Sequence, residues 1–391
     1  MVGSSGWWAT NALASQQPLL VASLPEHAGI GNLLSVTTQL GNVAPFVYKA
    51  TEEAFDWDVG KVVHVLQIAG CLVLFWAALL WNSEVGNHSI PLLILSSCAG
   101  AVGSLSDVTF WAYAMRFPPQ CTKAVSVGMS LGGLLASGLA AAQLVGVQGG
   151  VPRATVTVFL LACSAAQLGW WGAVLAVEDK CHGCRGTSKP KYLSDPLMVT
   201  NSPRHSRTLQ SLDSAAAENL SSLPRARVLF LVSSCFSLYG ATYTVPSLLP
   251  FAASAYQDMP GAQQQLLLWM QVLQNLGDVG GRVLAPQQAN PTRLQRLAVS
   301  VCSTSLSTCF VALVFAAAKP SLLPVYLPYT AAQILLPALC FCFYFGRGLL
   351  VVWLYGVARR LTTHQPTAES LASTMGLCGQ VGALTANMAA F

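Results

Sequence analysis

Charged side chains are scarce in this sequence. Lys, Arg, Asp and Glu together make up 9% of the 391 residues, whereas a soluble globular domain has roughly 25%. Hydrophobic residues make up 53%, and the mean hydropathy is +0.54. A soluble chain of this length needs a charged surface, so the composition excludes a soluble protein and predicts an all-α protein that crosses a lipid bilayer several times. The net charge of +5 therefore does not indicate a nucleic-acid partner.

Motifs that serve catalysis or metal binding are also missing. The sequence has no glycine-rich phosphate loop, no pair of metal ligands at helical spacing and no nucleophile beside a general base. Cys181-His182-Gly183-Cys184 has the spacing of half a zinc site, but no second half follows. We interpret this segment as a loop, and we expect no enzymatic activity, no catalytic residue, no bound metal and no cofactor.

Long apolar runs are abundant, and most are long enough to cross a bilayer as one helix. They lie near residues 6–24, 28–48, 61–81, 89–113, 122–146, 154–176, 228–252, 263–285, 297–318, 325–358 and, more weakly, 368–391. These runs predict about eleven transmembrane helices in a 6+5 arrangement. We expect an N-terminal six-helix bundle (residues 1–177), a cytoplasmic basic loop (178–227) and a C-terminal five-helix bundle (228–391).

The basic residues predict which side faces the cytoplasm, because Lys and Arg are retained there. The polar segment 178–227 alone contains eight of the 20 Lys and Arg residues. With the N-terminus inside, 17 basic residues fall on the cytoplasmic side; only Arg153 and Lys319 fall outside, and Arg347 lies within a helix. We therefore predict that the N-terminus and the loop are cytoplasmic. Asn87, in the sequon Asn87-His88-Ser89, then lies outside, where it can be glycosylated.

Two short segments in the predicted halves resemble each other. The second helix of the first half reads Gln39-Leu40-Gly41-Asn42-Val43, and the second helix of the second half reads Asn275-Leu276-Gly277-Asp278-Val279. Each follows a helix with a proline in its middle, Pro18 or Pro246. Parallel repeats with a substrate site between them are a transporter architecture. We expect a pseudo-repeat like that of the major-facilitator and equilibrative transporters.

Polar groups inside a bilayer are costly, so each needs a partner or a function. They concentrate in the first, second, fourth, seventh and eighth predicted helices, where a cavity between the halves would lie. For any single residue, a hydrogen bond between helices is the plainer interpretation. Asp107 is a lone carboxylate that either couples transport to a proton or pairs with a donor such as Arg347. Asp278 and Arg282 stand at i and i+4, which predicts a local ion pair.

Glycines in the fifth predicted helix indicate close helix packing. Gly128 and Gly132 stand four residues apart and are followed by Gly133. Small residues at this spacing let the backbone of a neighbouring helix approach. We expect this surface to be structural.

Several motifs resemble one known family, the eukaryotic riboflavin transporters of the solute carrier group. The resemblance is dense over residues 7–135 and thin after 227. It departs from the family pattern at Ala14, Gln16, Gly103 and Met129, and Asp107 stands one turn from the position of the family's aspartate. The motifs that carry it are Trp7-x3-Asn11-x6-Pro18-Leu19-Leu20, Leu24-Pro25-Glu26, Gln39-Leu40-Gly41-Asn42-Val43-Ala44-Pro45, Val108-Thr109-Phe110, Arg116-Phe117-Pro118-Pro119 and Val127-Gly128-x-Ser130-Leu131-Gly132-Gly133.

The resemblance implies an eleven-helix plasma-membrane carrier that moves riboflavin, as a small-molecule substrate and not as a cofactor, by alternating access. The flat isoalloxazine ring needs aromatic or apolar faces, and its polar edge and ribityl hydroxyls need amide and hydroxyl partners. Two rivals remain: a carrier of another flat polar solute, such as a nucleoside or nucleobase, and a receptor or scaffold that transports nothing. We expect the substrate-binding residues to be Trp7, Asn11, Gln39, Asn42, Thr109, Tyr243, Asn275 and Asp278, with Asp107 as the coupling group.

Overall fold

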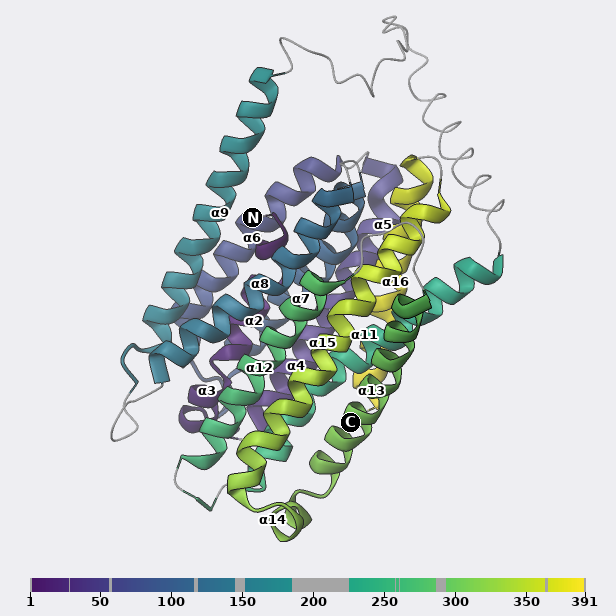
Figure 1. The fold of residues 1–391 in the computed structure, drawn as a ribbon. Coiled ribbons are helices and arrows are strands. Elements are labelled where there is room, and N and C mark those ends of the chain that lie inside the picture. Colours follow the sequence, from purple (N-terminus) through teal and green to yellow (C-terminus); the bar gives the residue numbers. More distant parts are fainter. Residues whose placement is uncertain are drawn as a thin grey trace, which may run out of the picture.

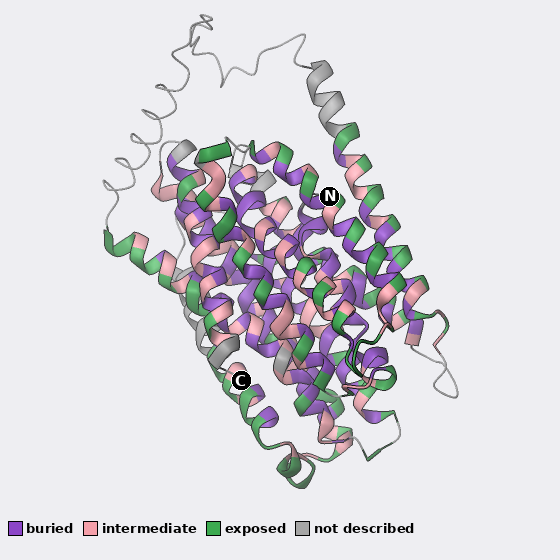
Figure 2. Ribbon diagram, turned by 180° about the vertical axis from the view of Figure 1, so that it is seen from behind, coloured by how far each residue is buried: buried purple, intermediate pink, exposed green. Residues whose placement is uncertain are grey.

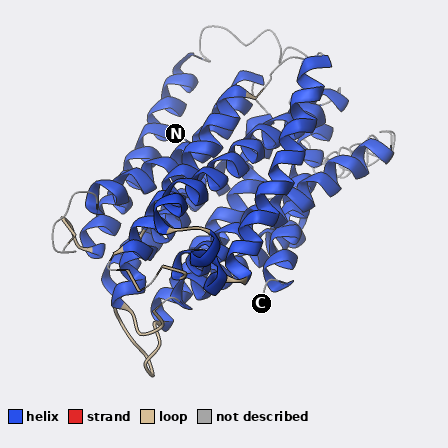
Figure 3. Ribbon diagram, turned by 60° about the horizontal axis from the view of Figure 1, so that its bottom comes forward, coloured by secondary structure: helices blue, strands red, loops and turns tan. Residues whose placement is uncertain are grey.

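In the described residues, the computed structural model is a bundle of helices (Figure 1), several of which are joined by short loops (Figure 3). It describes residues 2–27, 29–55, 58–115, 119–144, 152–184, 225–256, 258–259, 261–285, 293–362 and 365–389. Most of the predicted basic loop, residues 185–224, therefore lies outside the described residues. Helices α9 and α15 finish at the upper end of the bundle in Figure 1, which we call the loop end; α14 and the turn after α3 lie at the far end.

The helices follow the predicted apolar runs from the first to the last. In the first part of the chain they are α1 (Val2–Gly6), α2 (Trp8–Ser15), α3 (Gln17–Ser23), α4 (Gly29–Leu40), the 3-10 turn η1 (Gly41–Val43), α5 (Ala44–Phe55), α6 (Val59–Leu80), α7 (Ile90–Met115), α8 (Pro119–Leu144) and α9 (Val156–Cys184). In the second part they are α11 (Arg225–Ser254), α12 (Ala262–Leu284), α13 (Arg293–Ala318), η3 (Pro320–Leu322), α14 (Leu323–Tyr326), α15 (Tyr329–Leu361) and α16 (Gln365–Ala389).

The first two predicted spans are broken rather than continuous. The run 6–24 forms three short helices, which separate at Trp7 and Gln16, and the run 28–48 changes to a 3-10 turn at Gly41. The break at Gln16 has a local cause, because Pro18 has no backbone N–H with which to continue the α-helical hydrogen bonds. The expectation of two uninterrupted helices is therefore wrong.

The protein crosses the membrane several times. In the described part of the chain, six helices are long and apolar enough to span a bilayer, or seven if the bent pair 306–318 and 320–326 counts as one span. Apolar side chains such as Val65, Leu72 and Trp76 are exposed on α6, as expected of a face that meets lipid. Figure 2 shows the exposed residues on the outside of the bundle and the buried ones within. The multi-pass architecture is confirmed, and the count of eleven stays a prediction.

Glycines let the second helix of each half approach a later helix of the same half. A Cβ atom at Gly41 would lie 2.2 Å from the backbone N of Ala101 in α7, and one at Gly277 would lie 2.4 Å from the carbonyl O of Phe341 in α15. Both distances are too short for a real side chain, so glycine is needed at both positions. The repeated Leu-Gly-Asn/Asp-Val context thus marks equivalent close contacts in the two halves.

The glycine surface of α8 also contacts a neighbour as expected. A Cβ atom at Gly132 would lie 2.5 Å from the carbonyl O of Ser4 in α1, and Gly128 lies beside the backbone of Gly3. Helix α1 therefore packs directly on the backbone of α8. This contact fixes the start of the chain, including Trp7, against the centre of the bundle.

Candidate functional site

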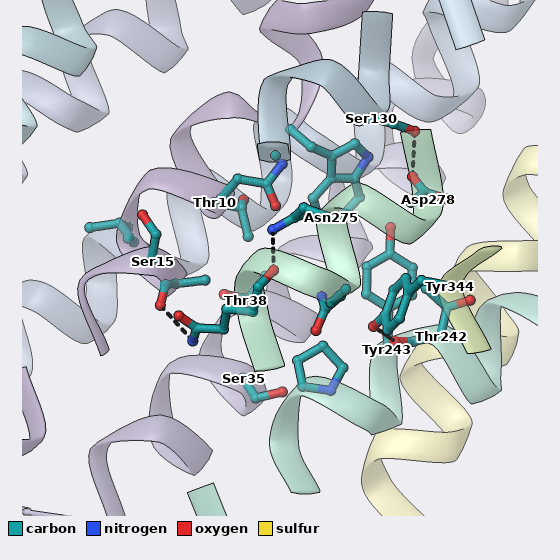
Figure 4. A pocket seen from close by; sticks show the side chains of 18 of the residues that line it. Thr10, Ser15, Ser35, Thr38, Ser130, Thr242, Tyr243, Asn275, Asp278 and Tyr344 are labelled. Carbon is teal, nitrogen blue, oxygen red and sulfur yellow. Dashed lines mark hydrogen bonds between the residues drawn. The ribbon is translucent and has the colours of Figure 1, made fainter. Parts of the chain in front are cut away.

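A cavity of about 160 Å³ lies between helices of the first and second parts of the chain (Figure 4). Its wall is formed by side chains of α2, α3, α4, α7 and α8 from one part and of α11, α12 and α15 from the other. Most of the lining residues carry polar side chains. In a membrane-spanning bundle such a concentration is costly unless the groups serve a function.

Two prolines expose backbone carbonyl groups to this cavity. In a regular helix, the N–H of residue i donates to the carbonyl of residue i−4, and proline has no N–H to donate. Pro18 therefore leaves the carbonyl of Ala14 free, and the Gln271 side chain donates to that oxygen at 3.1 Å. Pro246 likewise leaves the carbonyl of Thr242 free, and the Tyr344 hydroxyl donates to it at 2.9 Å. The prolines that marked the repeat in the sequence thus perform the same task in both halves.

Neutral amides dominate the part of the cavity nearest the far end. Gln271 of α12 donates to the Gln17 side chain of α3 at 2.9 Å and so joins the two parts of the chain. The side-chain oxygens of Thr10, Gln271 and Gln274 are buried and have no hydrogen-bond partner among the described residues. Buried polar atoms are seldom left unpaired in native proteins. These oxygens therefore have unused hydrogen-bonding capacity.

The side chains of Asn11 and Asn275 both lie close to Gly133. A Cβ atom at Gly133 would lie 2.4 Å from the Asn275 side-chain oxygen and 3.3 Å from the Asn11 side-chain nitrogen. Glycine at this position thus leaves room for one amide from each part of the chain. Asn275 also donates to the carbonyl of Gln271 at 3.0 Å, which fixes its orientation.

The aromatic rings of Trp7 and Tyr243 line part of the cavity, and Tyr239 packs next to Tyr243. The centroids of Trp7 and Tyr243 are 5.2 Å apart, and those of Tyr243 and Tyr239 are 6.0 Å apart. Gly103 makes room for Trp7, because a Cβ atom there would lie 2.7 Å from the indole ring. A flat solute can pack on such rings by offset or tilted stacking.

A buried ion network lies toward the loop end. Asp278 accepts from Arg282 at 3.1 Å and from Arg347 at 2.7 Å, and it also accepts from the Ser130 hydroxyl of α8. Arg282 donates in addition to the backbone and hydroxyl oxygens of Ser126 at 3.0 Å. The predicted ion pair of Asp278 and Arg282 is confirmed. It is part of the cavity wall and joins α12 to α8.

Asp107 has neutral partners. Its carboxylate accepts from the Gln380 amide at 2.9 Å and from the Tyr243 hydroxyl at 3.5 Å. Asp107 thus pairs with donors, as one of the two interpretations held, but the suggested donor Arg347 bonds to Asp278 instead. Asp107 lies in the cavity wall, and its role as a coupling group stays a prediction.

The structure brings together most of the residues that the sequence singled out. Asn42 and Thr109 are the exceptions: both are buried but lie outside the cavity lining. Asn42 donates to Gln39 at 2.5 Å, and the Thr109 hydroxyl bonds to the Leu105 carbonyl of its own helix at 2.9 Å. The candidates that line the cavity are Trp7, Asn11, Gln39, Asp107, Tyr243, Asn275 and Asp278. Their part in substrate binding remains a prediction.

Arg347 is one of the lining residues that our sequence predictions did not place in the site. A single arginine inside the apolar run 325–358 was the available signal, since an intramembrane charge usually has a function. Gln271 and Gln274 gave a weaker signal as amides in the same helix as Asn275. Helix periodicity alone does not show which of these side chains point inward.

Comparison with known proteins agrees with this architecture. The chain is similar in structure to the human organic anion transporter MFSD10 (TETRAN), whose crystal structure is known. The match covers 100% of this chain and 91% of that one, with a TM-score of 0.56 and 15% sequence identity. That level of identity supports the transporter fold and no more.

Similarity in sequence to known proteins covers part of the chain. A relative in Danio rerio, solute carrier family 52, riboflavin transporter, member 3-B, is 29% identical over 153 residues, 38% of this chain and 34% of that protein. Riboflavin transporter 2 of Salmo salar is 30% identical over 154 residues, 38% of this chain and 33% of that protein. The chain thus matches about a third of the length of these relatives. The predicted resemblance is confirmed: residues 1–159 match the family model of the solute carrier family 52 riboflavin transporters.

Proposed function

We propose that this protein is a plasma-membrane carrier of riboflavin that works by alternating access. One observation carries the proposal: the segment that matches the riboflavin transporter family, residues 1–159, supplies one complete wall of the cavity. Trp7, Asn11, Gln39 and Asp107 all belong to that wall. The family similarity therefore covers residues that would touch a solute, not only the scaffold around them.

The chemistry of the cavity suits a flavin. Riboflavin is neutral at pH 7, with one flat ring system and a chain of hydroxyl groups. Trp7 and Tyr243 offer a face for the ring, and the unpaired oxygens of Thr10, Gln271 and Gln274 accept hydrogen bonds from hydroxyl groups. A scaffold that transports nothing would gain no benefit from these unpaired polar atoms, whose burial is costly.

The size of the cavity supports a moving carrier. Pockets for drug-sized ligands hold roughly 300–1,000 Å³, and this cavity holds about 160 Å³. A flavin therefore requires the two parts of the chain to separate. Among the contacts that join them are the hydrogen bond of Gln17 with Gln271 toward the far end, and those of Ser126 and Ser130 with the Arg282–Asp278 pair toward the loop end. Breaking one set at a time would open the cavity to one side at a time.

We also propose that the N-terminus and the loop 178–227 face the cytoplasm, as the 17 to two distribution of basic residues indicates. A protease site placed within residues 185–220 should then be cut only after the cells are opened. Asn87, exposed in the turn before α7, should be the glycan acceptor if one is used. Cleavage of the loop from outside intact cells would overturn this orientation.

Uptake of labelled riboflavin into a riboflavin-auxotrophic cell tests the proposed function. We expect saturable uptake that flavins compete and nucleosides do not, in cells where the chain is shown to reach the surface. Cells without the chain give the background. Equal competition by nucleosides would favour a carrier of another flat solute, and no uptake above background would reject transport of riboflavin.

A further inference from the structure

Arg347 lies where helix α15 packs closely against helix α12. It stands between Gly346 and Gly348 on α15 and is buried. A Cβ atom at Gly348 would lie 2.5 Å from the carbonyl O of Asp278, so the glycine allows α15 to approach α12 at the level of that carboxylate. This approach places the Arg347 guanidinium in the cavity wall.

The ion network leaves Arg347 with donor capacity to spare. Two guanidinium groups share the single carboxylate of Asp278. One Asp278 oxygen accepts from Arg282 and Ser130, and the other accepts from Nη1 of Arg347. Nε of Arg347 is buried and has no hydrogen-bond partner among the described residues. Arg282 differs, because its Nε donates to Asp278 and its Nη1 donates to Ser126.

The nearby acidic group does not use this capacity. Asp107 also lines the cavity, but its carboxylate accepts from Gln380 and Tyr243. A buried cationic donor without a full set of acceptors is costly. The Arg347 guanidinium therefore favours a solute that presents an electron-rich acceptor, because a guanidinium only donates hydrogen bonds and stays charged.

Arg347 is also a neighbour of the aromatic residues. The Arg347 guanidinium lies over the Tyr239 ring, with its carbon 5.8 Å from the ring centroid. Tyr239 lies next to Tyr243, and Tyr243 lies next to Trp7. Trp7, Tyr243 and Arg347 line the same cavity, so a flat ring system stacked on the two aromatic rings would share that cavity with the guanidinium.

We propose that Arg347 is a specificity-determining residue, which recognises the acceptor edge formed by N1 and the C2 carbonyl of the flavin ring. The inference rests on the proposed function and adds the atoms that are recognised. It explains the spare donor of Arg347 without requiring a charged substrate. It also predicts how the solute is oriented in the cavity. The acceptor edge of the ring binds at the charged wall, and the hydroxyl chain binds at the amide wall.

The test compares two flavin analogues as competitors of labelled riboflavin uptake. In 1-deazariboflavin a C–H group replaces the N1 acceptor, and in 5-deazariboflavin the same change is made at N5, away from the proposed contact. Loss of a hydrogen bond to a charged group lowers affinity roughly 10- to 100-fold. With the parent chain, we expect 1-deazariboflavin to compete 10- to 100-fold less well than riboflavin, and 5-deazariboflavin to compete about as well as riboflavin.

Two lysine variants then assign the contact to one residue. Arg347→Lys keeps a positive charge for Asp278 but lacks the planar fork, and its preference for riboflavin over 1-deazariboflavin should disappear. Arg282→Lys is the matched control, because Arg282 shares the same carboxylate, and the preference should remain in that variant.

Three results would overturn the inference. Equal competition by both analogues in the parent chain would do so without any variant, even if Arg347→Lys fails to fold. An unchanged preference in folded Arg347→Lys would also reject it, while the proposed function would stand. No riboflavin uptake by the parent chain would reject both.

Discussion

The two ends of the cavity are closed by different chemistry. Toward the far end the halves meet through neutral groups, the side chains of Gln271 and Gln17 and the carbonyl of Ala14. Toward the loop end they meet through the charged network of Asp278 and Arg282 with Ser126 and Ser130 of α8. A neutral hydrogen bond contributes about 1 kcal/mol, and one to a charged group about 1.5–3 kcal/mol. Of these two sets of hydrogen bonds, the set at the far end is therefore the weaker.

Of the changes considered, Asp278→Asn should have the largest effect, because it removes the charged contacts at the loop end. The change leaves Arg282 and Arg347 buried without a carboxylate, which costs about 3–5 kcal/mol. We expect a large fall in the thermal unfolding midpoint of the protein in detergent, or its retention inside the cell. Asp107→Asn is the matched control, because it removes the other cavity carboxylate, whose partners are neutral. Equal effects of both changes would contradict a special role for the ion network.

Asn275→Ala and Gln39→Ala test the wall between the two ends. Loss of one partner in a substrate contact costs about 1–3 kcal/mol, which corresponds to a loss of affinity of about 5- to 150-fold. We expect riboflavin uptake to weaken by this factor while surface expression stays near normal. Thr37→Ala on α4 is the control, since its hydroxyl bonds only to carbonyls of its own helix. If the two test variants are retained inside the cell instead, these residues hold the bundle together and do not bind the solute.

The neutral contact at the far end, the hydrogen bond between Gln17 and Gln271, should contribute little to the stability of the protein. We expect Gln271→Ala and Gln17→Ala each to destabilise the closed protein by about 1 kcal/mol. The double variant should lose less than the sum, because the two side chains share one hydrogen bond. Thermal unfolding of the parent, both single variants and the double variant measures this coupling. Additive losses would show that the Gln17–Gln271 bond does not join the halves.

An effect of similar size, but dependent on pH, is expected outside the cavity, at Glu26 in the turn between α3 and α4. Burial raises the pKa of Glu26, but hydrogen bonds from the backbone N–H and hydroxyl of Ser89 lower it more, so its pKa lies below the usual value. A lowered pKa means stability that is present at neutral pH and is lost as pH falls through the folded-state pKa. Glu26→Gln should cost about 1 kcal/mol at pH 7. The difference in unfolding midpoint from the parent should shrink below about pH 4, and a difference independent of pH would contradict this.

Sequence patterns marked the positions whose behaviour follows from backbone chemistry. Pro18 and Pro246 cannot donate a backbone hydrogen bond, so each had to leave a carbonyl free, and both carbonyls are found at the cavity. Gly41 and Gly277 lie in the same short motif, and both allow a close contact between helices. Asp278 and Arg282 pair at i and i+4 because helix geometry requires that proximity.

Features that depend on tertiary distance could not be predicted in this way. Arg347 was a possible partner for Asp107, and only the packing of α15 on α12 shows that it reaches Asp278. Thr109 is as polar and as central as its neighbours in the sequence, but its hydroxyl faces the backbone of its own helix. The break at Trp7 was not expected, because the run 6–24 is apolar throughout that region.

Transport by the purified chain in lipid vesicles tests the central proposal most directly, because no cellular enzyme can trap or modify the substrate there. We predict that vesicles containing the chain take up labelled riboflavin faster than empty vesicles, that unlabelled riboflavin saturates the uptake, and that Asn275→Ala weakens it. Uptake no faster than that of empty vesicles, by a chain shown to be folded in the membrane, would contradict the proposal that this cavity carries riboflavin.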